Sequence, residues 1–439
     1  MVEFRAAEIA AAVGGTLSGS DVAIDGAGFD SRLIGPGQLF VPVRGERDGH
    51  DFIDAARQGG AVATFSSRGA IDGLATIEVA DVEIAFSLLG AHARNQLPNR
   101  VAGITGSVGK TSTKDLAAAI LALRFVTTAN EKSFNNELGV PLTLVNAATD
   151  TEVAIVEMGA RGNGHIADLC AIARPTVAIV TSIEIAHSEF MGGLDDIARA
   201  KGELVESLPA DGVAILNADN PRVAAMASRT SARTISYGVN AGEVRASGIV
   251  VGDDLRVQFQ LESEWGTAAV HLDVRGVHHV GNALAAASLA LLWEVPMADV
   301  VDGLEQAALS PWRMELHVAP SGARILNDAY NAGPASMEAA LRSLAQLPAS
   351  RHYAVLGPMA ELGDQSAEAH AYVASVAKEL DIHLIAVGTD GYRPTAQQTV
   401  STIEEAVAAL GSLDANDAVL VKGSRIAGLE RLATALLAG

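Results

Sequence analysis

The stretch Val101-Ala-Gly-Ile-Thr-Gly-Ser-Val-Gly-Lys-Thr-Ser112 decides the fold of the central part of this chain. Its apolar start is typical of a buried strand, its glycine-rich middle of a tight turn, and residues 111–123 of a helix. In that context backbone N–H groups point at phosphate oxygens, Lys110 reaches the β- and γ-phosphates, and Thr111 offers its hydroxyl to Mg²⁺. A purely structural glycine turn is the alternative, because Ile104 occupies the place of the first glycine in the strict pattern. The expected nucleotide-binding residues are Gly106, Ser107, Val108, Gly109, Lys110, Thr111 and Ser112.

Outside this loop, the apolar runs outline further strands and helices. Strand-like runs alternate with helical segments, as in a parallel sheet, at 153–156, 177–181 and 213–217. Residues 244–274 change to a period of two, which predicts an antiparallel appendage, and an Ala/Leu-rich helix follows at about 280–293. From residue 311 onward strands and helices alternate again, which predicts a doubly wound domain.

The expected fold class is therefore α/β with three domains. Residues 1–98 would form a small α/β domain, 99–310 a central parallel-sheet domain that carries the phosphate loop, and 311–439 a Rossmann-like domain. Hydrophobic residues make up 49% of the 439 residues but aromatic residues only 4%. Cores built from Ala, Val, Leu and Ile suit parallel sheets covered by Ala-rich helices.

Charge and cysteine content narrow the classes of function. The formal net charge of −21 disfavours nucleic-acid binding, because such a surface repels phosphate backbones. The single cysteine, Cys170, excludes an intramolecular disulfide and lies in an apolar stretch, where we expect a core residue. No apolar run approaches the roughly 20 residues of a membrane span, and the N-terminus lacks a signal-peptide core. We expect a cytoplasmic monomer.

Several motifs resemble those of the Mur ligase family, and they follow the family's order along essentially the whole chain. The loop form Gly103-Ile-Thr-Gly-Ser-Val-Gly-Lys-Thr-Ser-Thr113 resembles the family's version, in which the first glycine is displaced. Similar matches occur at 128–141, Val156-Glu-Met-Gly-Ala160, Ala186-His187, Ala200-Lys-Gly-Glu203, Gly276-Val-His278 with Asn282, and Arg313. The resemblance implies an ATP-dependent amide ligase.

Other segments point to a subgroup of that family. Asp30-Ser-Arg32 and residues 40–50 resemble the uridine-binding domain shared by the two later ligases of peptidoglycan precursor synthesis. Residues 327–337, 356–364 and 421–425 resemble the last of these ligases. The preceding one would carry Asp-Asn-Pro-Arg in the third block, whereas Asp219-Asn-Pro-Arg222 lies in the second and is expected to form a turn. The implied substrates are UDP-N-acetylmuramoyl-tripeptide, D-alanyl-D-alanine and ATP.

The resemblance also implies a set of metal ligands. Activating a carboxylate with ATP brings anions together, and Mg²⁺ and lysine neutralise them well. Two Mg²⁺ ions would be held by Thr111, Glu157, His187 and Lys201, the last as a carbamate formed with CO₂. From the residues alone, Glu157 could instead cap a helix, His187 could be structural, and Lys201 could lie on the surface. Lys110, Glu157, His187 and Lys201 are the expected catalytic residues.

The remaining expected contacts come from all three blocks. Asn136 and Asn282 would bind phosphate and adenine, or cap helices. Arg313 and Asp328 would reach ATP from the third domain, so that domain closure assembles the site. The nucleotide-sugar substrate would be held by Ser31, Arg32 and Arg44. The dipeptide would lie near Asn331, Lys422, Ser424 and Arg425.

The chain departs from the family pattern at three places, and two other functions stay open. His279 and Gly333 each replace a usual Asn, and Ile183-Glu-Ile185 stands where Gly-Pro is common. One alternative is a Mur-like amide ligase for another carboxylate and amine. The other is a nucleotide-gated scaffold that has lost catalysis. The third residue of the accepted peptide is not determined by the sequence.

Overall fold

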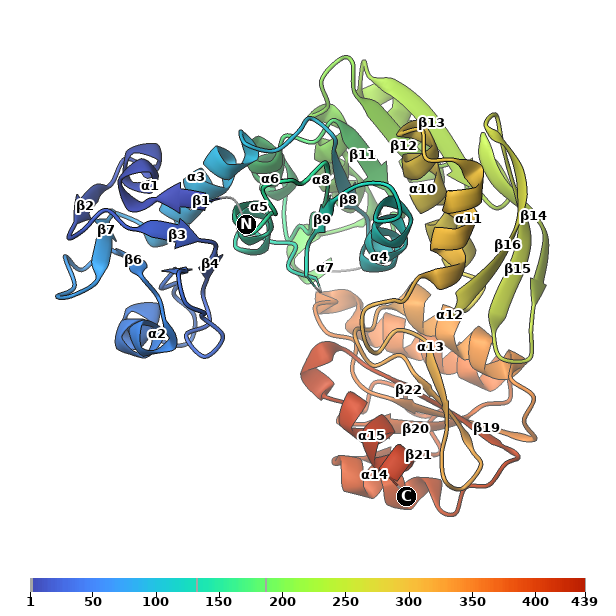
Figure 1. Ribbon diagram of the computed structural model, residues 1–439. Coiled ribbons are helices and arrows are strands. Elements are labelled where there is room, and N and C mark those ends of the chain that lie inside the picture. The colour runs from blue at the N-terminus through green and yellow to red at the C-terminus, as the bar shows by residue number, and fades with distance from the viewer. Residues whose placement is uncertain (1–2, 132, 186–187, 439) are drawn as a thin grey trace.

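The computed structural model describes residues 3–131, 133–185 and 188–438, and three large β-sheets follow one another along the chain (Figure 1). Each sheet is combined with helices, which confirms the predicted α/β class. The strand-rich N-terminal part, the central part with its large sheet, and the C-terminal part occupy different regions of the molecule (Figure 1).

The N-terminal part holds a five-stranded sheet in the order β2-β7-β6-β5-β4 and a separate pair of β1 with β3. Its strands are β1 (Glu3–Arg5), β2 (Thr16–Ser18), β3 (Ala23–Asp25), β4 (Ala27–Gly28), β5 (Leu39–Phe40), β6 (Ala63–Ser66) and β7 (Ala75–Glu78). Its helices are α1 (Ala6–Val13), η1 (Gly49–Phe52), α2 (Ile53–Gly59) and α3 (Val82–Arg94). Helix α3 begins at Asp81, whose carboxylate accepts hydrogen bonds from Glu83 N and Ile84 N.

Helix α3 packs against α5 and α6 of the central part. Gly90 permits this approach, because a Cβ there would lie 2.8 Å from Pro141 Cα. Buried apolar side chains from Phe4 to Ala232 consequently form one continuous hydrophobic cluster that spans the N-terminal and central parts.

The central part is a nine-stranded sheet in the order β16-β15-β14-β13-β12-β11-β8-β10-β9. Strands β8 to β13 run parallel, and the antiparallel β14–β16 predicted from the period of two continue the same sheet, because β14 pairs with β13. The strands are β8 (Val101–Thr105), β9 (Thr127–Ala129), β10 (Val153–Glu157), β11 (Val177–Val180), β12 (Val213–Asn217), β13 (Arg233–Gly238), β14 (Val244–Val251), β15 (Arg256–Ser263) and β16 (Gly266–Arg275).

Helices cover both faces of this sheet, so its inner strands are continuously apolar rather than alternating. Val101 and Val156 pack into the cluster that contains α3, α5, α6 and α8, whereas Ile104 and Ile155 pack against α4, α10 and α11. Cys170 lies in the first cluster, as predicted. The helices are α4 (Lys110–Leu121), α5 (Gly139–Val145), α6 (His165–Ala173), α7 (Ser188–Met191), α8 (Leu194–Glu206), α9 (Pro221–Ala224), η2 (Ala225–Arg229), α10 (His279–Leu292) and α11 (Met297–Gln306).

The C-terminal part is a six-stranded sheet in the order β17-β18-β22-β19-β20-β21, parallel except for β17. Its strands are β17 (Glu315–Val318), β18 (Arg324–Asn327), β19 (Arg351–Leu356), β20 (His383–Val387), β21 (Gln398–Val400) and β22 (Asp417–Lys422). Its helices are α12 (Pro334–Gln346), η3 (Gly363–Gln365), α13 (Ser366–Glu379), α14 (Ile403–Leu410), η4 (Arg425–Ala427) and α15 (Glu430–Ala438). The predicted doubly wound pattern is confirmed.

Candidate active site

The phosphate loop joins β8 to α4, and its glycines are required by close contacts. Gly106 has φ +147°, and a Cβ there would lie 1.9 Å from Thr181 Oγ1. Gly109, with φ +90°, immediately precedes the first residue of α4, Lys110. Lys110 Nζ donates to Gly106 O at 2.7 Å and to Ser107 O at 3.3 Å. The ammonium group therefore lies over the loop itself, at the N-terminal end of a helix that favours anions.

The segment after β11 braces this loop through its backbone. Ser107 Oγ donates to Glu184 O at 2.8 Å and accepts from Glu184 N at 2.9 Å. Val108 N donates to Ser182 Oγ at 3.1 Å. Because Ser107 uses the backbone of Glu184 and not its side chain, the loop tolerates Ile183-Glu-Ile185 in place of Gly-Pro. His187, which follows this segment, lies outside the described residues.

Glu157 ends β10 beside the loop and is 1% exposed. Its Oε1 accepts from Asn135 Nδ2 at 2.7 Å, and its backbone N donates to Asn130 Oδ1 at 2.6 Å. Its Oε2 is buried and has no hydrogen-bond partner among the described residues. An unpaired carboxylate oxygen is costly to bury, so this arrangement fits a bound cation.

Lys201 lies on α8 and is 1% exposed. Burial, and then the positive charge of Lys110, hold the pKa of Lys201 well below its usual value. Burial likewise lowers the pKa of Lys110, against the opposing effect of Glu157. A buried, neutral amine is the form that reacts with CO₂, so Lys201 fits carbamylation better than it fits a permanent cation.

The residues around Lys201 have separate structural reasons. A Cβ at Gly202 would lie 1.8 Å from Arg229 Nη1, because Arg229 crosses α8 to reach Ala198 O at 2.8 Å. Glu203 caps α6, since its carboxylate accepts from Gly164 N at 2.6 Å and Ala167 N at 3.1 Å. The Ala-Lys-Gly-Glu motif therefore combines one candidate catalytic residue with two that hold the helices in place.

Helix α10 approaches the loop from another side. A Cβ at Gly109 would lie 2.4 Å from Asn282 Oδ1, so only glycine permits this approach. Asn282 Nδ2 lies 3.1 Å from His279 Nδ1, and Thr113 Oγ1 donates to Asn282 Oδ1 at 3.3 Å. Burial lowers the pKa of His278 to about 4 and that of His279 well below its usual value. Both imidazoles are therefore neutral near pH 7.

The C-terminal part completes the cluster. The Arg313 guanidinium lies 4.1 Å from the ring centroid of Tyr330, and its Nε is buried without a hydrogen-bond partner among the described residues. The Tyr330 hydroxyl contacts Ser133 Oγ of the central part. The positive charge of Arg313 is close enough to lower the pKa of both Lys110 and His279. Arg313 thus reaches the phosphate loop across the junction.

Asp328 and the dipeptide-site candidates lie at the carboxyl ends of β18 and β22. Lys422 Nζ donates to Asp328 Oδ2 at 2.5 Å and to Asn331 O at 2.9 Å. Ser424 Oγ accepts from Ala360 N at 2.8 Å, which ties it to the 357–364 loop. Arg425 lies 4.4 Å from the Trp312 ring centroid. The structure therefore brings Lys422, Asp328 and Asn331 together.

Sequence and structure comparisons agree with this arrangement. Residues 23–87 match the Mur ligase family, catalytic domain, residues 104–290 the Mur ligase middle domain, and residues 312–425 the Mur ligase, glutamate ligase domain. The UDP-N-acetylmuramoyl-tripeptide--D-alanyl-D-alanine ligase of Escherichia coli (strain K12) is 36% identical over 99% of each chain. The chain belongs to the Mur ligase family.

Solved structures of Mur ligases extend the similarity to the whole fold. A crystal structure of MurF from Acinetobacter baumannii superposes with a TM-score of 0.91 at 31% identity, over 100% of this chain and 99% of the other. MurF from Thermotoga maritima in complex with ADP gives a TM-score of 0.83 at 25% identity, over 94% and 97% of the two chains. The family assignment therefore rests on the full length of the chain.

The N-terminal candidates of this Mur ligase stay apart from the phosphate loop. Arg32 is exposed and pairs with Asp30 (Nη2 to Oδ2, 2.6 Å), which lowers the pKa of that carboxyl to about 2. Arg44 is exposed and lies 3.5 Å from Asp48. Ser31 lies in the same turn as Arg32, before β5. These ion pairs are internal to the N-terminal part, so the expected contacts of these residues with the nucleotide sugar stay predictions.

Two asparagines next to each other have different contacts in this Mur ligase. Asn136 Oδ1 accepts from Gly139 N at 3.0 Å at the start of α5, which is the capping alternative considered for it. Its neighbour Asn135, which we did not single out, binds Glu157. Asn130, also missed, holds the Glu157 backbone. Their only sequence signal is membership of the Asn-rich segment at 128–141.

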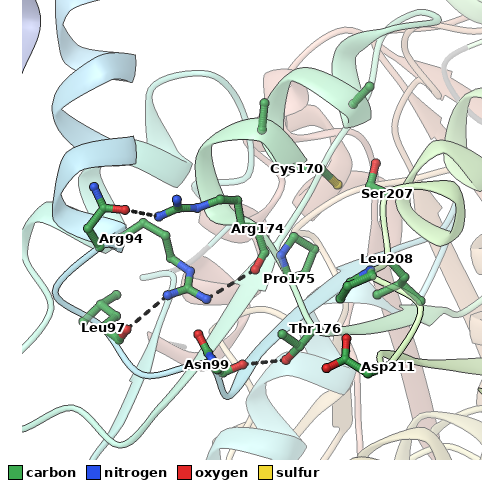
Figure 2. Close-up of a pocket in the computed structure, with 14 residues that line it drawn as sticks. Arg94, Leu97, Asn99, Cys170, Arg174, Pro175, Thr176, Ser207, Leu208 and Asp211 are labelled. Atoms are coloured by element: carbon green, nitrogen blue, oxygen red, sulfur yellow. Dashed lines mark hydrogen bonds between the residues drawn. The ribbon is translucent and has the colours of Figure 1, made fainter. Parts of the chain in front are cut away.

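An open cavity of about 790 Å³ lies away from this cluster, at the amino ends of the central strands (Figure 2). Asn99, Thr176 and Asp211 line it just before β8, β11 and β12. Arg94 closes one side and donates to Ala173 O at 2.7 Å and to Leu97 O at 3.2 Å. The cavity is a feature of the α3 junction, since the phosphate loop lies at the opposite ends of these strands.

Two searches of the described residues returned nothing further. Within residues 3–131, 133–185 and 188–438, no group of three His, Cys, Asp or Glu side chains is placed to hold a metal ion. No helix in that same portion of the Mur ligase combines the length and apolar character needed to cross a bilayer.

Proposed function

We propose that this chain joins D-alanyl-D-alanine to UDP-N-acetylmuramoyl-tripeptide, using ATP, in the synthesis of the peptidoglycan precursor. The observation that carries the proposal is the meeting of Lys110, Lys201 and Glu157 from the central part with Arg313 from the C-terminal part. Full-length similarity to ligases named for this reaction supports the substrates. Folylpolyglutamate synthase, at 17% identity and a TM-score of 0.59, shares only the fold.

The reaction has two bond-forming steps. An oxygen of the tripeptide carboxylate attacks the γ-phosphorus of ATP, and ADP leaves with the bridging oxygen. The amine of D-alanyl-D-alanine then attacks the carbonyl carbon of the acyl phosphate, gives up a proton, and displaces inorganic phosphate. Lys110 at the start of α4 would orient the phosphates, and Arg313 would offset charge that develops on the transferred group. The C-terminal part would exclude water from the acyl phosphate.

The residues around the loop also fit a divalent metal. Thr111, Glu157, His187 and carbamylated Lys201 would hold two Mg²⁺ ions, which when bound would neutralise the phosphate oxygens. The unpaired Oε2 of Glu157 and the lowered pKa of Lys201 support this assignment. Asn135 would hold Glu157 in orientation through its hydrogen bond to Oε1.

The substrates would bind on different parts of the chain. Ser31, Arg32 and Arg44 would hold the nucleotide sugar, and Asn331, Lys422, Ser424 and Arg425 would surround the dipeptide. The remaining ATP contacts would come from Asn136, Asn282 and Asp328 together with the loop residues Gly106 to Ser112. We further propose functional units at 1–98, 99–310 and 311–439, and a monomer that acts in the cytoplasm.

Phosphate release from ATP tests the proposal directly. Purified protein is mixed with Mg²⁺, UDP-N-acetylmuramoyl-tripeptide and D-alanyl-D-alanine, and each component is omitted in turn. Release that requires every component supports the reaction and both substrates. Release with only another carboxylate and amine would keep the ligase class and refute the substrates. Lys110→Ala is the matched control, because it removes the phosphate-binding ammonium and should abolish release.

The metal assignment has its own test. The rate should fall when CO₂ is removed from the buffer and recover when bicarbonate is added. Lys201→Ala should show no such response, and bicarbonate should not restore it. A wild-type rate that is independent of CO₂ would refute the carbamate and leave the ligase assignment standing.

A further inference from the structure

The turn between β14 and β15 connects the central part to the C-terminal part. Leu255, at the end of this turn, belongs to the central sheet by sequence but is fully buried in the hydrophobic cluster of the C-terminal part. Other members of that cluster include Met337, Leu341 and Leu344 from α12. Figure 1 shows the β14–β15 end of the central sheet reaching toward α12 and α13. The turn is therefore inserted into the neighbouring domain.

Leu255 has a backbone conformation that leucine rarely adopts. Its φ is +67°, in the left-handed region, and its N–H donates to Gly252 O at 2.9 Å to close the turn. The flanking Arg256 pairs with Asp254 and, at 2.6 Å, with Asp273. Such a conformation persists only where surrounding contacts determine it, and here those contacts belong to the C-terminal part.

A hydrogen bond leads from this turn to the nucleotide site. Leu255 O accepts from Gly276 N at 2.9 Å. Gly276 begins the segment that enters α10 and carries His278 and His279. A Cβ at Gly276 would lie 2.6 Å from His278 Cε1 and 3.3 Å from Met314 Cε, so this segment is tightly packed. His279 in turn lies against Asn282, beside Gly109 of the phosphate loop.

The other connection between the two parts also leads to the phosphate loop. Asp115, on α4, accepts from Ser310 N at 2.7 Å, just before the chain enters the C-terminal part. Met314, four residues later, lies in the same hydrophobic cluster as Leu255. The C-terminal part is therefore attached at two points, and each is one or two contacts from the phosphate loop.

We propose that Leu255 is a positioning residue for the ligation reaction, which fixes the C-terminal domain where Arg313 and Asp328 meet the phosphate loop. The inference rests on the proposed function, and it assigns a role to a residue that contacts neither nucleotide nor substrate. Truncation of Leu255 leaves a space in the C-terminal core that only this turn fills, so the docked orientation loses its main apolar contact.

Kinetics of three variants test the proposal. Leu255→Ala should lower kcat about tenfold or more, since fewer molecules reach the docked orientation, and its KM for UDP-N-acetylmuramoyl-tripeptide should stay within about twofold. Leu255→Met should keep kcat within about threefold, because a similar apolar volume fills the same space. Val250→Ala, from the same turn region but 60% exposed, is the matched control and should match wild type. A wild-type kcat for Leu255→Ala would overturn the proposal.

A distance measurement separates positioning from folding. Spin labels at Ser228→Cys and Ser401→Cys report the separation of the central and C-terminal parts, both positions being exposed. The natural Cys170 is buried and its pKa is raised to about 12, so it should escape labelling. Leu255→Ala should broaden the distance distribution with a non-hydrolysable ATP analogue present, while circular dichroism stays unchanged. An unchanged distribution would refute the positioning role.

The two proposals fail in different ways. If the wild-type chain does not turn over the named substrates, the proposed function falls, and the distance distribution alone decides the role of Leu255. If the wild type turns over and the distance distribution of Leu255→Ala is that of wild type, the function stands and this inference falls.

Discussion

Gly202→Ala should destabilise this protein, against the general preference of helices for alanine. Gly202 lies inside α8, where alanine would normally add about 1 kcal/mol of stability. A Cβ at this position would lie 1.8 Å from Arg229 Nη1 and 2.1 Å from Arg229 Cζ. The guanidinium would have to move, and it would give up its hydrogen bonds to Ala198 O at 2.8 Å and Arg199 O at 2.9 Å.

The size of the effect follows from those two bonds. Hydrogen bonds from a charged donor contribute about 1.5–3 kcal/mol each. The Arg229 side chain is 24% exposed, so water would replace part of this, and about 2–3 kcal/mol in total is a reasonable loss. The ion pair with Glu206, which is half exposed, adds little. After the gain in helix propensity, we expect a net loss of about 1–2 kcal/mol.

Urea unfolding of four proteins measures this effect: wild type, Gly202→Ala, Arg229→Ala and the double variant. On the Arg229→Ala background the clash is absent, so Gly202→Ala should stabilise by about 1 kcal/mol. Gly281→Ala is the matched control in α10, where nothing lies within 4 Å of an added Cβ, and it should also stabilise. Equal destabilisation by Gly202→Ala on both backgrounds would show that Arg229 is not the cause.

Three other results are expected. Glu157→Gln should reduce turnover by about a thousandfold or more, equivalent to about 4 kcal/mol, whereas Asn135→Ala should reduce it about 10–100-fold and raise the Mg²⁺ requirement in a titration. In CO₂-free buffer, wild-type stability should rise with pH between the lowered folded pKa of Lys201 and its unfolded value, because the unfolded chain binds more protons. Lys201→Met should lose that slope in urea unfolding at a series of pH values. Trp312→Leu removes the ring beneath Arg425 and should raise the KM for D-alanyl-D-alanine about two- to fivefold, and an unchanged KM would exclude this contact from dipeptide binding.

The sequence was sufficient to predict the strands and helices that carry a strong periodic pattern. The run before the phosphate loop is β8, the Ala/Leu-rich helix at about 280–293 is α10, and the period-two stretch forms β14–β16. In each of these the apolar pattern follows burial directly, on two faces of a parallel strand or one face of an antiparallel strand. Helix α3 was missed, because we followed short β-like runs through that part of the chain.

Contacts within the site were less accessible to sequence reasoning. Asn135 and Asn136 are adjacent and identical, and only the backbone path into α5 determines that Asn135 faces Glu157 while Asn136 caps the helix. The role of Gly202 depends on Arg229, 27 residues away, whose guanidinium crosses α8. Leu255 looks like an ordinary residue of a β-hairpin, and its burial depends on a domain that follows it in the chain.

The continuous cluster that joins α3 to α5 and α6 has a consequence for synthesis on the ribosome. Its buried members extend from Phe4 to Ala232, so the earliest residues translated cannot complete their packing until more than half of the 439 residues have been made. The first hundred residues would then wait with the apolar face of α3 uncovered, where a chaperone could bind. The C-terminal sheet, whose strands all lie between Glu315 and Lys422, can form within one short interval of translation.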